Sequence, residues 1–138
     1  SMYFPPHMKC KFIAEPGRYF AETIGTLLTK VIGTRDRPDS KDYWITDSLY
    51  GSFNCVLYDH IHLNPTPLRD DIDMSMKHTS TIWGPTCDGF DKIAENIQLP
   101  QLEYGDWLIW HNTGAYTIAG ACDFNGINFT APCKVYLQ

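Results

Sequence analysis

The chain has 138 residues, of which 43% are hydrophobic and 20% are charged, and this apolar content excludes an intrinsically disordered protein. Eleven Lys and Arg residues against sixteen Asp and Glu residues leave a net charge of −5. Because the basic residues form no cluster, we expect neither nucleic acid nor an anionic membrane as a partner. No apolar run reaches the roughly 20 residues that span a bilayer, so we expect one globular domain.

The cysteines favour a reducing compartment. Their number is odd, and no two of them stand at the C-x-x-C spacing that is typical of zinc sites and redox motifs. The N-terminus also lacks the pattern of a secretory signal. We therefore expect a cytoplasmic protein with reduced thiols at Cys10, Cys55, Cys87, Cys122 and Cys133.

Most predicted elements are short strands, because alternating or β-branched segments are repeatedly broken by turn residues. The start of 18–32 could form a helical turn, and 91–97 is a helical candidate because Ile93 and Ile97 lie four residues apart. Polar loops are expected at 33–41 and 68–77. The pattern predicts a mainly β fold, a Greek-key-like antiparallel β-barrel or sheet with one or two short helices. In chain order, the expected strands are 11–14, the later part of 18–32, 43–46, 53–62, 79–83, 107–110, 115–121 and 133–137.

The segment Glu15-Pro16-Gly17-Arg18 follows the first expected strand and carries two opposite charges. A glycine at a strand end permits close approach of a ligand to the backbone. Glu15 could hold a cationic ring, and Arg18 could hold an anion. The alternative is a turn with an exposed ion pair, which is common in proteins and contributes little stability.

The segment 83–89 (WGPTCDG) places Cys87 in a loop rich in glycine and proline, beside Asp88. Such a loop exposes its side chains. A neighbouring carboxylate disfavours the thiolate, so this pair favours a thiol that keeps its proton and can donate it. The alternative is a structural loop with a half-buried cysteine.

The segment 58–62 (YDHIH) has two histidines at i, i+2, which would share one face of a strand. They could ligate a metal, but no third ligand stands nearby in the sequence, so we expect no metal site. Asp59 could instead bind a cationic ligand. Tyr116 gives a weaker signal, because a tyrosine in a strand usually belongs to the core.

Six segments, in their order along the chain, resemble the C-terminal part of the eukaryotic ornithine decarboxylases, which are pyridoxal-phosphate-dependent enzymes of the alanine-racemase-like fold group. The resemblance runs from about Phe12 to about Leu137 and implies a TIM-type barrel followed by a β-rich domain. Residues 1–18 would then be a remnant of the last barrel strand, and 19–138 the C-terminal domain. The segments are EPGRYF (15–20), YGSFNCVLYDH (50–60), WGPTCDGFD (83–91), LPQLEYGDWL (99–108), GAYT (114–117) and FNG (124–126).

The resemblance also implies roles for individual residues in a homodimer whose active sites are shared between two subunits. Glu15 would pair with the pyridine nitrogen of the cofactor, and Arg18 and Tyr116 would hold its phosphate. Asp59 would contact the distal amine of the substrate. From the partner subunit, Cys87 would give a proton to the α carbon and Asp88 would contact the substrate amine. The residues implied at or near the subunit interface are Tyr50, Asp91 and Phe124.

The activity that the resemblance implies is decarboxylation of L-ornithine to putrescine in polyamine biosynthesis. The family's Schiff-base lysine and its glycine-rich phosphate loop belong to the barrel, and no lysine of this chain stands in a matching context. We therefore expect the 138 residues alone to be inactive. One alternative is an inactive paralogue that binds antizyme (an antizyme inhibitor), although such regulators tend to lose Cys87 and its neighbours. Another is a decarboxylase for arginine or lysine, although Asp59 in YDH favours ornithine.

Overall fold

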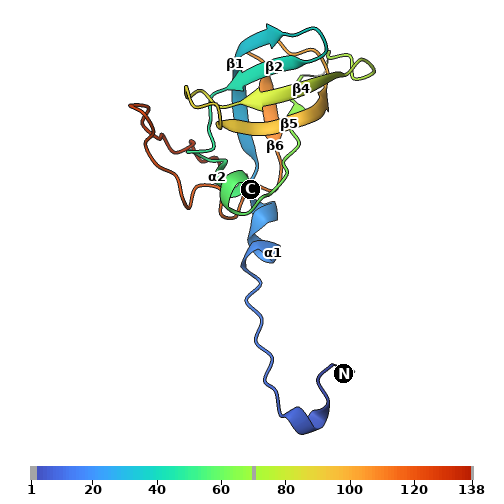
Figure 1. The fold of residues 1–138 in the computed structure, drawn as a ribbon, viewed down its shortest axis with the longest axis vertical. Coiled ribbons are helices and arrows are strands. Elements are labelled where there is room, and N and C mark those ends of the chain that lie inside the picture. The colour runs from blue at the N-terminus through green and yellow to red at the C-terminus, as the bar shows by residue number, and fades with distance from the viewer. Residues whose placement is uncertain (1–2, 70, 138) are drawn as a thin grey trace.

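Six strands form one sheet in the order β3-β6-β1-β2-β4-β5. Figure 1 shows how the sheet curls, with β1, β2, β4, β5 and β6 labelled. The structure, a computed structural model, describes residues 3–69 and 71–137. The mainly β fold expected from the sequence is confirmed. The strands are β1 (Leu27–Asp36), β2 (Lys41–Ile45), β3 (Thr66–Pro67), β4 (His78–Trp83), β5 (Lys92–Leu99) and β6 (Trp107–Trp110), and the helices are α1 (Gly17–Ala21) and α2 (Asn54–Tyr58), with 3₁₀ turns η1 (Pro6–Met8) and η2 (Glu22–Ile24).

The core lies on the inner face of the curled sheet. Alternate residues of β1 point inward, so that Leu27, Thr29 and Val31 are buried while Leu28 between them is exposed. Thr29 is buried at no cost in lost hydrogen bonds, because its Oγ1 accepts a bond of 2.8 Å from the indole N–H of Trp110. The fully buried aromatic and aliphatic side chains that complete this core include Tyr43, Ile45, Phe53, Ile82, Leu102, Leu108 and Trp110.

Four of the five strand pairings in the described sheet are antiparallel, and the fifth corrects the expectation of a purely antiparallel sheet. β2 and β4 run parallel, with Tyr43 opposite Ile82. The residues between these strands include α2 and β3, so the chain passes through the far edge of the sheet at β3 before it returns beside β2. Parallel neighbours need such a long connection, and strand patterns in a sequence do not show which strands will be neighbours.

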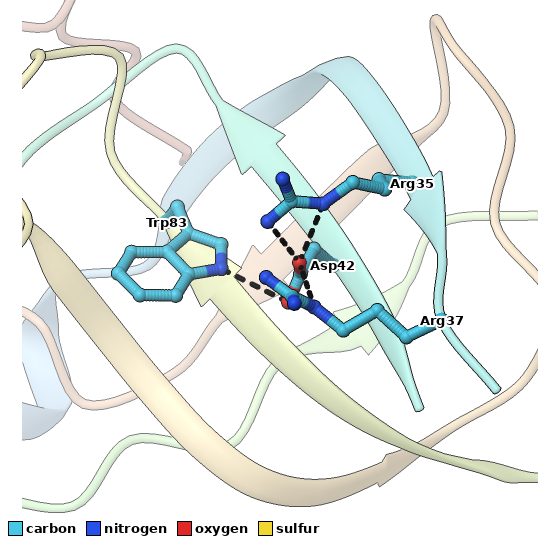
Figure 2. Close-up of polar contacts among 4 residues, drawn as sticks. All are labelled: Arg35, Arg37, Asp42 and Trp83. Carbon is cyan, nitrogen blue, oxygen red and sulfur yellow. Dashed lines mark hydrogen bonds and ion pairs between the residues drawn. The ribbon is translucent and has the colours of Figure 1, made fainter. Parts of the chain in front are cut away.

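A buried carboxylate joins the three strands β1, β2 and β4. Asp42 accepts hydrogen bonds from Arg35, with Nε at 3.0 Å and Nη2 at 2.6 Å, and from Arg37 Nε at 2.6 Å. The indole N–H of Trp83 donates to its other oxygen at 3.2 Å (Figure 2). Burial by itself raises the pKa of Asp42, but the hydrogen bonds from these three side chains outweigh it and hold the pKa below its usual value.

Segment 53–62 forms α2 and not the expected strand. Asn54 and Cys55 are buried at the start of this short helix, and the Asn54 side chain donates to the Gly51 carbonyl at 2.9 Å. The backbone N–H of Asp59 bonds to the Cys55 carbonyl at 2.9 Å and closes the helix. These contacts bury Asn54 and Cys55 and stabilise a helix. The alternation of residue types that predicted a strand contains no information about such contacts.

Segment 91–97 is the reverse case, because the expected helix is part of strand β5. Between Ile82 and Ser80, β4 advances two residues while β5 advances three, from Ala94 to Ile97, which is a β-bulge. Asn96 lies in this bulge with a φ of 57°. Ile93 and Ile97 both contact the core across the bulge, so their helix-like spacing of four residues arises within a strand.

Three further expected strands are wrong, because 11–14, 115–121 and 133–137 contain none. Residues 11–14 belong to an extended segment that leads away from the sheet (Figure 1), where no neighbouring strand is available to pair with them. Residues 115–121 form turns instead. The strands expected within 18–32 and at 43–46, 79–83 and 107–110 are confirmed, as is the helical turn at the start of 18–32. None of the described helices has the length and hydropathy to cross a membrane.

The expected loop 33–41 is shorter than predicted, since β1 extends to Asp36 and β2 begins at Lys41. No helix or strand lies within the described part of 68–77, as expected. The assignment of 1–18 to a barrel strand stays a prediction, and its first two residues lie outside the described range.

Candidate functional site

One candidate cluster gathers Arg18, Asp59 and Tyr116 from three distant parts of the chain, and we call it the arginine cluster. The Arg18 guanidinium pairs with the Asp59 carboxylate, with Nη2 and Oδ2 at 2.5 Å. Its Nη1 donates to the Ala115 carbonyl at 3.4 Å, and its central carbon lies 5.0 Å from the centroid of the Tyr116 ring. The structure thus brings together three of the side chains that the sequence singled out.

Two glycines hold α1 against the turn that carries Tyr116. A Cβ atom on Gly25 would lie 2.6 Å from the Cα of Gly114, so neither residue tolerates a side chain at this crossing. The backbone N–H of Thr113 donates to Gly25 at 2.9 Å, and that of Gly114 donates to Glu22 at 2.8 Å. The crossing of Gly25 and Gly114, together with these two hydrogen bonds, fixes the distance between Arg18 and Tyr116.

Gly17 has a direct role in the arginine cluster. A Cβ atom on Gly17 would collide with the Tyr116 hydroxyl, so only glycine lets that hydroxyl lie against the backbone here. Tyr116 itself has a φ of 58°, which is uncommon for a bulky residue and turns its ring toward α1. The result is that one guanidinium and one hydroxyl lie side by side at the start of α1.

Glu15 lies apart from this cluster. Its side chain is exposed, and among the described residues its carboxylate has no hydrogen-bond or ion-pair partner. Its carbonyl accepts from the N–H of Gly17 at 2.9 Å, just before α1 begins. The cationic-ring partner expected for Glu15 stays a prediction.

A second candidate cluster surrounds the loop that follows β4, and we call it the thiol cluster. It contains Cys87, Asp88, Tyr50 and Phe124. The Tyr50 hydroxyl donates a short hydrogen bond to Asp88 Oδ2. This bond, aided by burial, raises the pKa of Tyr50 to about 12, and it lowers the pKa of Asp88. The Tyr50 ring stacks on Phe124 with centroids 3.9 Å apart and planes 3° from parallel.

Asp91 anchors the loop of the thiol cluster through its buried side chain. Its carboxylate is buried, with 1% of the residue exposed. It accepts hydrogen bonds from Ser48 Oγ at 3.1 Å and Leu49 N at 2.9 Å, and from Thr86 N at 3.2 Å and Thr86 Oγ1 at 2.7 Å. A Cβ atom on Gly84 would overlap this carboxylate, which explains the glycine there. These contacts are internal to the chain, and a place for Asp91 at a subunit interface stays a prediction.

Asn125 belongs to the thiol cluster, and the sequence did not reveal it as a site residue. Its Nδ2 donates to the Sγ of Cys87 at 2.8 Å. In the sequence, Asn125 and Gly126 show only as a turn, because Asn-Gly is a preferred turn pair. The signal that could have revealed it is its place directly after Phe124, in a segment that the resemblance includes.

A cavity of about 370 Å³ adjoins the thiol cluster. Tyr50, Thr86, Phe124 and Cys122 contribute to its walls, together with the segment 127–133. Cys122 is tied to the cluster by its N–H, which donates to the Tyr50 carbonyl at 2.9 Å. The cavity therefore borders the thiol cluster on the side of Tyr50 and Phe124.

The two histidines of 58–62 form no metal centre with other residues. Within 3–69 and 71–137, no group of three or more His, Cys, Asp or Glu side chains is placed to hold a metal ion. His60 has a φ of 54°, so the chain turns directly after Asp59. This turn ends α2 and leaves Asp59 beside Arg18.

Comparison with known proteins identifies the family of this domain. Residues 18–114 match the family described as "Pyridoxal-dependent decarboxylase, C-terminal sheet domain". The matched range spans the whole six-stranded sheet and includes Arg18, Asp59, Cys87 and Asp88. The expected family is confirmed.

Individual relatives cover nearly the whole chain. It is 47% identical over 135 residues to the chloroplastic ornithine decarboxylase of Nicotiana glauca, which covers 93% of the chain and 31% of that protein. It is 43% identical over 137 residues to antizyme inhibitor 2 of Xenopus laevis, covering 91% of the chain and 30% of that protein.

Among solved structures, the arginine decarboxylase of Paramecium bursaria Chlorella virus, bound to agmatine, is similar with a TM-score of 0.76 and 40% identity, covering 81% of this chain and 31% of that one. The chain therefore spans about a third of the length of the relatives that it matches. It belongs to the pyridoxal-dependent decarboxylases, as the sheet domain that forms the C-terminal part of these enzymes.

Proposed function

We propose that this domain is part of an ornithine decarboxylase, which releases carbon dioxide from L-ornithine and leaves putrescine. The observation that carries the proposal is the presence, in one folded domain, of both the arginine cluster and the Cys87-Asp88 pair. The first offers a site for an anion and the second offers a proton donor beside a carboxylate. The 47% identity to an ornithine decarboxylase supports this choice of substrate.

The arginine cluster fits the phosphate of pyridoxal phosphate. A phosphate dianion requires donors, and the arginine cluster offers the Arg18 guanidinium and the Tyr116 hydroxyl, which Gly17 allows to lie against the backbone. Glu15, a few residues before the cluster, would pair with the pyridine nitrogen. When bound, the cofactor supplies the electron sink that makes loss of carbon dioxide feasible.

The Arg18–Asp59 ion pair gives the arginine cluster a second property. Arg18 now bonds to the carboxylate that we expect to bind the distal amine of the substrate. A phosphate dianion would compete with Asp59 for the guanidinium, because Arg18 favours the higher charge. Binding of the phosphate would therefore release Asp59 for the cationic substrate, and the cofactor would bind before the amino acid.

The thiol cluster would complete the active site of a partner subunit in a homodimer. Asp88 would bind the cationic amine together with Asp59, since two carboxylates hold a diamine better than one. Cys87 would donate the proton that the α carbon receives after carbon dioxide leaves. This role requires a thiol that carries its proton until the α carbon accepts it.

The test is turnover by the full-length protein that carries this domain, loaded with pyridoxal phosphate and offered ornithine, arginine or lysine. We expect carbon dioxide release with ornithine at a kcat/KM at least tenfold above the other two, and putrescine as the product by mass spectrometry. Cys87→Ala is expected to divert turnover toward abortive transamination. Clean putrescine at the normal rate from Cys87→Ala would remove Cys87 from the proposed role.

A second candidate function is regulation through antizyme, which the 43% identity to antizyme inhibitor 2 of Xenopus laevis favours. Retention of Cys87, Asp88, Asp59 and Glu15 favours the enzyme, because a protein that only binds antizyme does not need them. Antizyme binding without carbon dioxide release by the full-length protein would establish the regulator. Carbon dioxide release would establish the enzyme, whether or not antizyme binds.

A cytoplasmic location is also part of the proposal. It is supported by the cysteines, all five of which are free thiols in the structure. Cell fractionation followed by immunodetection of the full-length protein would test it, and enrichment in an organelle fraction would contradict it.

A further inference from the structure

The sulfur of Cys87 has a hydrogen-bond donor from outside its own loop. The amide Nδ2 of Asn125 donates to Cys87 Sγ at 2.8 Å, across 38 residues of sequence. We propose that Asn125 is a positioning residue for Cys87, which orients the thiol and stabilises the negative sulfur that remains when the proton has left. The inference rests on the proposed function, because it assigns Asn125 a part in the proton transfer expected of Cys87.

The position of Asn125 is set by a tight turn. Phe124 and Ile127 exchange both backbone hydrogen bonds, at 3.0 and 2.9 Å, across Asn125 and Gly126. These two central residues have φ values of 48° and 79°, as a type I′ turn requires. The turn therefore fixes the backbone from which the Asn125 side chain extends.

The turn is tied to the thiol loop through Tyr50. The ring of Phe124 stacks on Tyr50, and the N–H of Cys122 bonds to the Tyr50 carbonyl at 2.9 Å. Tyr50 in turn donates to Asp88, the residue next to Cys87. The contact between Asn125 and Cys87 thus closes a ring of contacts.

The thiol loop is held independently from its other side. The Gly84 N–H bonds to the Asp91 carbonyl at 2.8 Å, the Asp91 N–H bonds to the Asp88 carbonyl at 3.0 Å, and the Asp91 carboxylate holds Thr86. The backbones that carry Cys87 and Asn125 are therefore both held by contacts other than the bond between the two side chains.

A neutral amide suits the chemistry of this step. When Cys87 donates, its S–H bond breaks, a C–H bond forms with the electron pair left on the α carbon, and the S–H electron pair stays on sulfur. An N–H group that already points at the sulfur bonds more strongly to the thiolate than to the thiol, because charge-assisted hydrogen bonds are about twice as strong as neutral ones. The bond therefore strengthens as the proton leaves, which is the requirement for faster turnover. Asp88 cannot supply this stabilisation because its charge is negative.

Two substitutions separate this role from the turn. Asn125→Gly keeps the left-handed backbone but removes the amide. Asn125→Asp keeps the size and the turn preference but replaces the donor with a carboxylate. In the full-length enzyme, both are expected to lower kcat about tenfold with little change in KM and to increase the fraction of transaminated by-product. Unchanged kcat and by-product in both variants would overturn the inference.

A second measurement uses the 138-residue chain and requires no activity. The rate at which iodoacetamide alkylates Cys87 is followed by peptide mass spectrometry at constant pH. Asn125→Asp is expected to slow it at least fivefold, whereas Asn128→Asp, which adds the same charge nearby, is expected to change it less than twofold. Equal rates in the two variants would overturn the inference. If the unmodified full-length protein released no carbon dioxide, the proposed function would fail and the role of Asn125 in turnover would fail with it, whatever the alkylation result.

Discussion

Two buried carboxylates, Asp42 and Asp91, hold different parts of the domain together. Each is at most 2% exposed, and each accepts hydrogen bonds from several groups. Asp42 is held mainly by cationic side chains, whereas Asp91 is held by hydroxyl and backbone donors. Their substitution should therefore have different consequences.

Asp91→Ala should destabilise the domain by about 3 to 5 kcal/mol, because it leaves the buried donors of Ser48, Leu49 and Thr86 without an acceptor. Urea unfolding followed by tryptophan fluorescence measures this loss. The matched control is Asp39→Ala, which removes an exposed carboxylate and should change the free energy of unfolding by no more than about 0.5 kcal/mol. Similar losses in the two variants would contradict the anchoring role of Asp91.

Asp42 predicts a dependence of stability on pH. Its pKa is lower in the folded chain than the ordinary value of 3.8, so its contribution is fully present above that value and is lost as the pH falls through the lowered pKa. Urea midpoints measured from pH 6 to pH 2.5 should therefore fall steeply below about pH 4. Asp42→Asn should be about 2 kcal/mol less stable at pH 6 and should show a shallower fall. Parallel curves for the two proteins would contradict the prediction.

At the scale of elements, strand β5 shows how one backbone angle changes a whole segment. In the described sheet, β5 pairs with β4 on one side and with no strand on the other, so it is an edge strand. Edge strands with bulges and charged residues resist pairing with other chains, and the bulge at Asn96 beside the exposed Glu95 has this character. The left-handed conformation of Asn96 also interrupts any helix over 91–97.

Substitutions at Asn96 test this explanation. Asn96→Gly should leave the free energy of unfolding within about 0.5 kcal/mol of the original, because glycine adopts positive φ without strain. Asn96→Val should lower it by about 1 to 2 kcal/mol, because a β-branched residue is strained there. Chemical denaturation of both variants gives the comparison. A valine variant as stable as the glycine variant would show that the bulge is not required.

The helical segment formed by α1 and η2 is the other element that positions the arginine cluster. It connects the N-terminal segment 3–16 to the sheet (Figure 1), and the close approach of Gly25 and Gly114 sets its position. Arg18 extends from this helical segment toward Asp59 and Tyr116. The arginine cluster therefore depends on backbone packing more than on the strength of its own ion pair.

At the scale of the whole molecule, the domain contains only part of the active site that we propose. The arginine cluster and the thiol cluster are both present, but no lysine stands in the sequence context of the family's Schiff-base lysine. Many apolar side chains of the N-terminal segment, among them Phe12 and Ile13, are exposed.

The 138-residue chain alone should therefore form no specific covalent adduct with pyridoxal phosphate. After one equivalent of the cofactor and reduction with borohydride, intact-mass and peptide mass spectrometry should find no single lysine carrying a pyridoxyl group in more than about a tenth of the chains. The full-length protein under the same conditions should be labelled at one site. Stoichiometric labelling of one lysine within the 138 residues would contradict the prediction.

Local patterns in the sequence were sufficient to predict the mainly β class and the core strands at 43–46, 79–83 and 107–110. β-branched and alternating residues favour a strand through interactions that extend over only a few positions of the chain. They failed for α2 and β5. A buried Asn54 and a bulge at Asn96 depend on neighbours that are distant in the sequence.

The sequence by itself determined the family and the candidate residues, since motifs such as WGPTCDG are carried by identity and order. Only the tertiary structure decided which of these residues meet. Arg18 reaches Asp59 across 41 positions and Ala115 across 97, and Asn125 reaches Cys87 across 38. Such contacts are set by the crossing of Gly25 and Gly114 and by the stacking of Tyr50 on Phe124. Chain crossings and side-chain packing are properties of the folded backbone, and no local pattern of residue types encodes them.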